Sequence, residues 1–292
     1  MTNTFLWIAL GFFILASILP RQFRLQRMPV GGIGWIFFAI YWALQPLYYI
    51  KEGDMSMVLL MLLVAFICII IAHLMVNTYV NSKKGLERDN PVDRQKTLFS
   101  VTTVTAIGCL FYFPFAQIDP LNHLIIKTVT SQTFWLSQLV GFPVVRLDWN
   151  LIMLEGYKVE IILACTAIES IALFFGLILG TRVEAKRILL ALMASIPVIY
   201  ILNVIRNTFV IGAYGYEWFG SGPMILNIFG HEFFLHNSAS FYISHHLIAK
   251  GGSGIALFFI AYMVLKTLPE LLDLIDDLWK LIKADLSYIR GG

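Results

Sequence analysis

The sequence predicts an all-α polytopic membrane protein with about seven transmembrane helices. Hydrophobic residues make up 59% of its 292 residues and charged residues only 13%, against roughly 25% charged residues in an ordinary soluble domain. The mean hydropathy is +0.78, and the apolar residues are gathered into runs long enough to cross a bilayer. A soluble fold has too little interior for this much apolar surface, so we expect the chain to lie in a membrane.

Charge and cysteine usage argue against several kinds of partner. The net charge is only +3, and no basic face is interleaved with aromatic residues, so nucleic acid is not expected to bind. Cys68, Cys109 and Cys165 are scattered within or beside apolar runs, and they form neither a disulfide framework nor a CxxC metal pair. Neither a metal ion nor a cofactor is therefore expected.

Seven apolar runs have about the 17 to 25 residues that a transmembrane helix needs. The first run could be taken for a signal peptide, but no basic segment precedes it and Pro20-Arg21 is a poor cleavage site. We therefore keep it as a spanning helix. The predicted spans are residues 5–20, 31–50, 55–76, 97–115, 164–180, 188–213 and 241–265.

Lysine and arginine are distributed unevenly between the two alternating sets of loops. The set that contains residues 21–27, 77–96 and 181–187 holds eleven of them, and the other set holds four. Because cytoplasmic loops carry the excess of basic residues, the first set is predicted to be cytoplasmic. The amino terminus then lies outside the cell and the carboxyl terminus inside, in a multi-pass protein of the cytoplasmic membrane.

Three segments are predicted to lie outside the bilayer core. Residues 122–140, within a long outer segment 117–162, carry apolar residues at helical spacing with Trp135 among them, which is typical of a helix at the membrane interface. Partial two-residue alternation around Glu155-Gly156 predicts a β-hairpin that leads to Cys165. Residues 268–292 are predicted to form an amphipathic helix on the cytoplasmic surface, separate from the transmembrane domain 1–267.

A cysteine, an arginine and a histidine lie near the ends of runs that residue counting places at the same membrane face. Cys165 and Arg206 are 41 residues apart, which suits one inward and one outward crossing. Arg206 and His245 are 39 residues apart, which suits an excursion outside followed by re-entry. At a rise of 1.5 Å per residue, all three are expected within about two helical turns of the outer face.

Polar neighbours strengthen the prediction of a site. An arginine near the centre of a membrane helix costs roughly 2.5 to 3.5 kcal/mol, so such a residue is usually paired or functional. Asn203 and Asn207 flank Arg206 and give that end of the helix a polar side. Glu169 follows Cys165 by four residues, which predicts one shared helical face, and its carboxylate could hold the guanidinium or the imidazole in place.

These residue types are those that cysteine acyl transfer requires. A helix amino terminus and a nearby cation lower the pKa of a cysteine thiol, and the thiolate of Cys165 would attack a carbonyl to form a thioacyl-enzyme. Arg206 would stabilise the oxyanion, and His245 would carry the proton. His246 is adjacent, about 100° away around a helix, and is the alternative to His245.

Each of these residues also has a purely structural interpretation. A lone cysteine is usually a small buried hydrophobe, an arginine near a membrane surface can extend its charge to the interface, and Glu169 can serve as a structural partner alone. His231 and His236 are five residues apart, whereas the histidines of a metalloprotease helix are four apart on one face. They do not predict a metal site.

The segments ACTAIES around Cys165 and NVIRN around Arg206, with a histidine opening the last span, resemble the exosortase/archaeosortase family of transpeptidases. The resemblance covers most of the chain. It implies that Cys165 is the nucleophile, that Arg206 is the second catalytic residue, and that His245 occupies a third position where some members carry arginine. It also implies substrates with a carboxyl-terminal PGF motif, one membrane helix and a basic tail. Cleavage outside an archaeal cell would then be coupled to attachment of a prenyl-derived lipid that anchors S-layer and other surface proteins.

Two other functions account for part of the pattern. An intramembrane cysteine protease would hydrolyse the thioacyl intermediate with water instead of transferring it. A non-catalytic transporter or scaffold would use Arg206 and Glu169 as a binding pair, and would not depend on the thiol of Cys165.

Overall fold

The computed structural model describes residues 2–51, 55–85, 92–228 and 231–291. The chain divides into two compact units, which are described separately. Unit 1 comprises Met1–Leu110, Gly176–Val183 and Leu268–Gly292, and unit 2 comprises Phe111–Phe175 and Glu184–Thr267. Arg88, one of the basic residues behind the predicted orientation, lies outside the described residues.

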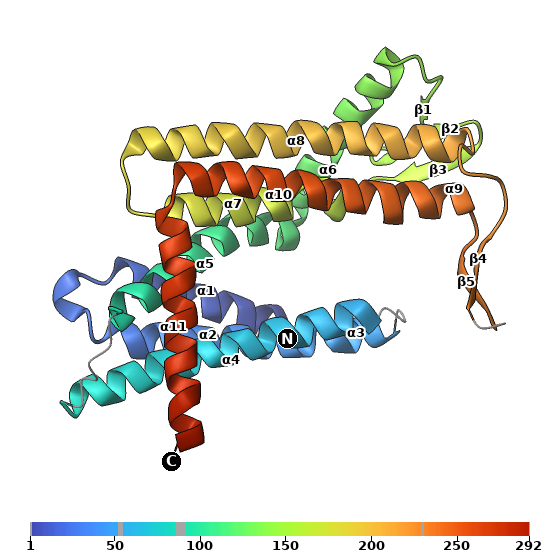
Figure 1. Ribbon diagram of the computed structural model, residues 1–292. Helices are drawn as coiled ribbons and strands as arrows, with labels where there is room; N and C mark the ends of the chain where they lie inside the picture. Colours follow the sequence, from blue (N-terminus) through green and yellow to red (C-terminus); the bar gives the residue numbers. More distant parts are fainter. Residues whose placement is uncertain (1, 52–54, 86–91, 229–230, 292) are drawn as a thin grey trace. The chain divides into compact units, whose positions relative to one another are not determined.

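Most of the chain is helical, and among the described residues five helical segments are long and apolar enough to cross a membrane (Figure 1). The prediction of seven spans is thus supported in part, because α1 (Thr2–Ile18) and α7 (Ile168–Gly180) are apolar but shorter. The five are α2 (Arg27–Leu44), α4 (Met55–Lys83), α5 (Arg94–Gln117), α8 (Ala185–Gly215) and the continuous segment Ala239–Thr267.

The second predicted span, residues 31–50, is wrong in its extent. Helix α2 ends at Leu44, and a separate short helix, α3 (Pro46–Lys51), follows after a turn at Gln45. Proline lacks a backbone N–H, so Pro46 cannot donate the helical hydrogen bond to the carbonyl four residues before it. Pro46 therefore explains why one apolar run becomes two helices.

The fifth predicted span is also corrected at its start. Leu163–Cys165 forms a single 3₁₀ turn, η2, and α7 begins only at Ile168. Between them Ala167 has a φ of 60°, in the left-handed region that residues with a Cβ seldom adopt. Cys165 thus lies in a turn before the helix rather than inside it.

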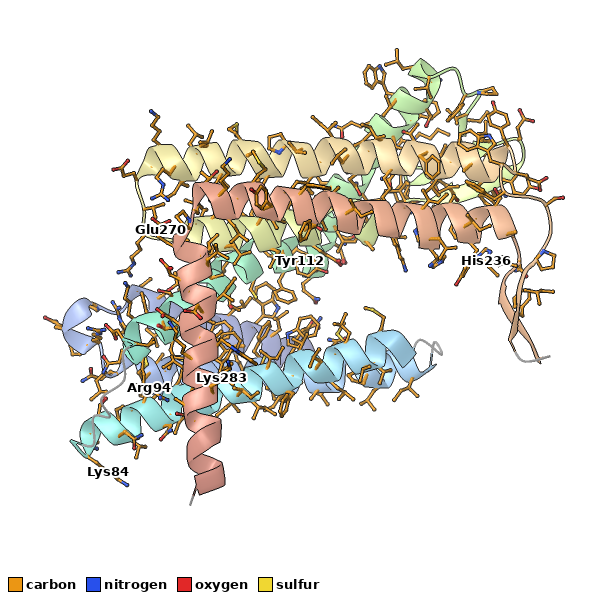
Figure 2. The ribbon with its side chains drawn as sticks, in the orientation of Figure 1. Lys84, Arg94, Tyr112, His236, Glu270 and Lys283 are labelled. Atoms are coloured by element: carbon orange, nitrogen blue, oxygen red, sulfur yellow. The ribbon has the colours of Figure 1, made fainter. Side chains whose placement is uncertain are left out.

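Unit 1 is built on the packing of α1, α2 and α4, with α5 beside them. Phe13 of α1 packs against Trp35 of α2, with ring centroids 5.0 Å apart, and the indole N–H of Trp35 donates a 3.0 Å hydrogen bond to the Thr102 hydroxyl of α5. Figure 2 labels Lys84, just beyond the end of α4, and Arg94, the first residue of α5. Apolar packing and one buried polar pair therefore hold these helices together.

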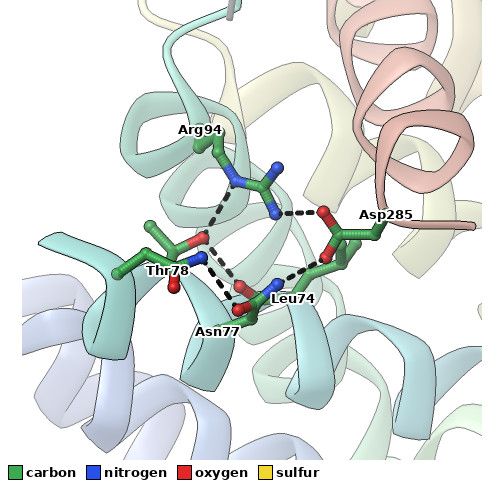
Figure 3. Close-up of polar contacts among 6 residues, drawn as sticks. Leu74, Asn77, Thr78, Arg94 and Asp285 are labelled. Carbon is green, nitrogen blue, oxygen red and sulfur yellow. Dashed lines mark hydrogen bonds and ion pairs between the residues drawn. The ribbon is translucent and has the colours of Figure 1, made fainter. Parts of the chain in front are cut away.

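The carboxyl-terminal helix α11 (Glu270–Gly291) is held to unit 1 by a polar network (Figure 3). Arg94 of α5 donates to Asp285 at 2.9 Å, and Asn77 of α4 donates to the other oxygen of Asp285, also at 2.9 Å. The side chain of Asp285 is 7% exposed. A helix at the predicted place is confirmed, and its attachment depends on a buried carboxylate as well as on buried leucines such as Leu271 and Leu281.

Unit 2 contains α6 (Asp119–Leu139) and a small antiparallel sheet, both packed on α8. The predicted hairpin is confirmed as β2 (Leu151–Leu154) and β3 (Tyr157–Glu160), and β1 (Val145–Arg146) extends the sheet. The turn residues Glu155 and Gly156 both have positive φ, 49° and 85°, as a tight hairpin turn requires. Ile152 and Leu154 pack with Ile211 of α8, which ties the sheet to that helix.

A second hairpin, β4 (Met224–Ile228) and β5 (His231–His236), follows α8 (Figure 1). The sequence predicts only an excursion outside the membrane for this part of the chain. After the hairpin, α9 (Ala239–Phe241), the π-helical segment η3 (Tyr242–Ala249) and α10 (Lys250–Thr267) form one continuous helical segment, and η3 and α10 contact α8.

Candidate functional site

Cys165 lies at the end of the η2 turn, where β3 has delivered the chain to the start of α7. Its backbone N–H donates to the Ile162 carbonyl at 2.8 Å, and the Thr166 hydroxyl donates to the Leu163 carbonyl at 2.6 Å. The left-handed Ala167 then reverses the chain into the helix. Backbone conformations of this kind persist only when the surroundings enforce them, and they are concentrated at functional sites.

Two asparagines of α8 enforce the position of this turn. The side-chain amides of Asn203 and Asn207 both donate to the backbone carbonyl of Cys165, at 2.7 Å and 2.9 Å. Both asparagines are buried, with 8% and 5% exposure, and their four-residue spacing puts them on the same face of α8. The two bonds are called the asparagine clamp below. The clamp fixes Cys165 against the part of α8 that carries Arg206.

Arg206 contacts the histidine predicted to accompany it. A terminal guanidinium nitrogen of Arg206 lies 3.5 Å from Nε2 of His245. Arginine has donors only, so Nε2 is the acceptor in this contact. The Nε atom of Arg206 and the Nδ1 atom of His245 are both buried, and neither has a hydrogen-bond partner among the described residues. Buried polar atoms are normally paired, so this pair retains donor capacity for another group.

The structure distinguishes the two adjacent histidines. The ring of His245 stacks on Phe241, with centroids 5.1 Å apart, and faces Arg206. The ring of His246 stacks on Tyr242 instead, also at 5.1 Å. Both belong to η3, and π-helical turns are rare and often occur at functional sites. Only the orientation of His245 brings an imidazole to the guanidinium.

A pocket of about 320 Å³ adjoins this cluster within unit 2. Arg206, Glu169 and Lys250 line it together with small and apolar side chains of α7, α8 and α10. Lys250 was missed in the sequence analysis, although a lysine inside an apolar run, five residues after His245, is a signal for a site. The pocket therefore combines charged groups with apolar walls, as binding pockets commonly do.

Glu169 does not have the partner that was expected. Its Oε1 atom accepts a 3.3 Å hydrogen bond from the hydroxyl of Tyr112, which lies on α5 (Figure 2). Among the described residues it forms no ion pair with Arg206. The prediction that Glu169 and Cys165 share one helical face is also wrong, because Cys165 precedes α7. Both Glu169 and Arg206 nevertheless line the same pocket.

The side chain of Cys165 is half-buried beside an apolar cluster. The cluster is formed by Ile126, Val129 and Ile161, and Tyr200 of α8 also packs against it. This places the thiol between the sheet, α6 and α8. Cys165, Arg206 and His245 are thus linked through the asparagine clamp and one direct contact, and all three belong to unit 2.

The fold and the site together define a polytopic membrane protein with a clamped cysteine turn next to an arginine–histidine pair. Residues 2–234 match the model of the transmembrane exosortase family, and the chain belongs to that family. It is similar to archaeosortase A of Haloferax volcanii, with 26% identity over 316 residues that cover 100% of this chain and 97% of that protein. It is also similar to archaeosortase A of Natronomonas pharaonis, with 24% identity over 98% of this chain and 90% of that protein. No solved structure matches the chain.

Proposed function

We propose that the protein is a membrane-embedded cysteine transpeptidase that processes surface-protein precursors. Its substrates would carry a carboxyl-terminal sorting signal of the PGF type followed by a membrane helix, and cleavage would be coupled to lipid attachment. The observation that carries the proposal is the asparagine clamp, which joins the Cys165 turn to α8 on both sides of Arg206. The family and the full-length similarity to two archaeosortases support it.

The reaction follows from the chemistry of the three side chains. The thiolate of Cys165 attacks the scissile carbonyl, and a C–S bond forms as the peptide C–N bond breaks. Arg206 stabilises the negative charge that develops on the carbonyl oxygen. His245 gives a proton to the departing amine and then takes one from the incoming nucleophile, whose attack breaks the C–S bond.

The remaining polar residues have supporting roles in this proposal. Asn203 and Asn207 are positioning residues, because they bond the backbone of Cys165 rather than the reacting atoms. Glu169 lines the pocket beside Arg206, where it would bind the substrate. His246 supports the η3 segment through its stacking on Tyr242.

The basic residues of the loops indicate on which side of the membrane the reaction takes place. We propose that the site opens at the outer face of the cytoplasmic membrane, with the amino terminus outside and the carboxyl terminus in the cytoplasm. A membrane lipid would then be within reach as the acceptor of the acyl group. No metal ion or cofactor takes part in the proposed steps.

Trapping the acyl-enzyme tests the proposal. Full-length protein in proteoliposomes is incubated with a precursor that carries a sorting signal, quenched with acid and digested, and the adduct is located by mass spectrometry. We expect the substrate fragment on Cys165, and no adduct in Cys165→Ala. The variants Cys68→Ala and Cys109→Ala serve as matched controls that should retain it. An adduct on Cys68 or Cys109, or turnover by Cys165→Ala, would refute the assignment.

The product then separates transfer from hydrolysis. Mass spectrometry of the new carboxyl terminus should show a lipid ester or amide, because the acyl group passes to a lipid. A free carboxylate would identify a protease that uses water. A folded Cys165→Ala variant that keeps full cellular function would instead favour a transporter or scaffold.

A further inference from the structure

A second pocket lies in unit 1, and none of the residues that line it takes part in the proposed reaction. It has a volume of about 420 Å³, and among the described residues four basic side chains and one carboxylate line it. The basic residues come from three separate parts of the chain. They are Arg24 and Arg27 before and at the start of α2, Lys96 in the first turn of α5, and Arg182 after α7.

An aromatic ring brings two of these cations together. The guanidinium carbon of Arg27 lies 4.3 Å from the ring centroid of Phe99, and that of Arg182 lies 5.0 Å from the same centroid. Arg27 is 8% exposed. Cations are attracted to an aromatic ring, but two of them on one ring repel each other. An anion beside Arg182 would weaken that repulsion.

The one carboxylate among the described lining residues is already engaged. Asp93 forms an ion pair with Arg24 through Oδ2 and accepts a 3.0 Å hydrogen bond from the Lys96 backbone N–H through Oδ1. Burial raises the pKa of Asp93, but these two partners outweigh burial and hold that pKa below its ordinary value. Over the described residues, the side chains of Lys96 and Arg182 form no ion pair. The described lining residues therefore carry an excess of positive charge even with Asp93 ionised.

The position of the pocket along the helices indicates the depth of its ligand. Arg27 is the first residue of α2, Lys96 is the third residue of α5, and Arg182 follows the last residue of α7 by two positions. All three are at the ends of apolar helices, where the headgroups of a bilayer begin. The amino termini of α2 and α5 add partial positive charge.

We propose that this pocket binds a phosphate group at the membrane surface. The phosphate would accept hydrogen bonds from Arg182 and Lys96 and would offset the positive charge that these two side chains bring to the pocket. Two sources have this chemistry: the headgroup of an anionic phospholipid and free inorganic phosphate. Basic pockets between membrane helices bind lipid headgroups in this way. The site is independent of the proposed transpeptidase reaction.

The test compares a pocket variant with a control of equal charge. Lys96→Gln/Arg182→Gln removes two pocket cations, and Lys83→Gln/Lys84→Gln removes two exposed lysines at the end of α4 that do not line the pocket. Full-length proteins are exchanged into nanodiscs of phosphatidylglycerol or phosphatidylcholine, extracted, and analysed by native mass spectrometry. Separately, thermal unfolding in a neutral detergent is followed with and without inorganic phosphate.

We expect the wild type and the lysine control to retain one phosphatidylglycerol molecule. The pocket variant should retain it roughly tenfold less, because losing a charge-assisted hydrogen bond lowers affinity by about that factor. Lys96→Arg/Arg182→Lys, which keeps both charges, should restore much of the retention. Saturable stabilisation by inorganic phosphate, with no selective lipid retention, would identify free phosphate as the source. Equal retention of both lipids, or equal losses in both double variants with no phosphate effect, would overturn the proposal.

Discussion

The asparagine clamp makes a quantitative prediction about Asn203 and Asn207. Replacing either residue with alanine leaves the Cys165 carbonyl with one donor, whereas replacing both leaves that carbonyl without its two side-chain donors. A hydrogen bond contributes about 1 kcal/mol, and an unsatisfied buried acceptor costs about 1–3 kcal/mol. We expect this free energy to raise the activation barrier, because the thiol is no longer held in place. Each single variant should then lose about fivefold in kcat, and the double variant about 10²-fold.

The assay measures kcat and KM for processing of a sorting-signal precursor by purified protein in proteoliposomes. The clamp acts on the position of Cys165 and not on substrate binding, so kcat should fall while KM changes less than about twofold. The matched control is Asn122→Ala, because Asn122 also donates its amide to a backbone carbonyl, that of Phe115, at 2.9 Å. The control removes the same kind of bond away from Cys165 and should leave kcat nearly unchanged.

A second readout separates positioning from folding. The rate of Cys165 alkylation by a small maleimide should change in the clamp variants while their thermal unfolding stays close to that of Asn122→Ala. A folded Asn203→Ala/Asn207→Ala variant with normal kcat would refute the reasoning. So would a loss that appears entirely in KM, because the clamp would then serve substrate binding.

Three further predictions concern single side chains. Arg206→Ala should lower kcat by about 10²- to 10³-fold, the usual effect of removing an oxyanion donor, with Arg206→Lys intermediate in the same assay because a lysine lacks the planar fork. His245→Ala should lose at least about 10²-fold and His246→Ala less than about threefold in single-turnover kinetics, since only His245 contacts Arg206. Asp285→Ala should destabilise unit 1 by about 3 kcal/mol, measured by denaturant or thermal unfolding, because Arg94 would keep a buried, unpaired charge.

Each of these three has a result that contradicts it. Equal activity of Arg206→Ala and wild type would remove arginine from the chemistry. A larger loss in His246→Ala than in His245→Ala would reverse the assignment of the proton carrier. Unchanged unfolding of Asp285→Ala, with Asp276→Ala as an exposed control on the same helix, would show that α11 is held by apolar contacts alone.

Local sequence patterns predicted correctly those features that depend on a single segment of the chain. The apolar runs predicted a membrane protein, and the hairpin around Glu155-Gly156 was predicted from partial two-residue alternation. The order of Cys165, Arg206 and His245 and the motifs around them indicated the family that the comparison then showed. The break at Pro46 was visible in the sequence as well, but hydropathy alone hid it, because proline interrupts a helix without lowering its apolar character.

Contacts between distant segments could not be predicted from local sequence patterns. The amides that bond the Cys165 carbonyl lie 38 and 42 residues further along the chain, and no periodicity reports which acceptor a buried asparagine finds. Periodicity also could not predict that Glu169 bonds the Tyr112 hydroxyl instead of a cation. Nor could it predict that Asp285 is buried.

By itself, the sequence determined that this chain lies in a membrane and that a hairpin leads to Cys165, and it predicted that an arginine and a histidine follow at matching depths. Only the tertiary structure decided that Cys165 lies in a strained turn before its helix and that His245 rather than His246 faces the guanidinium. The physical reason is that hydropathy and spacing report the environment of each segment. Hydrogen bonds and side-chain directions depend on which segments the fold brings together.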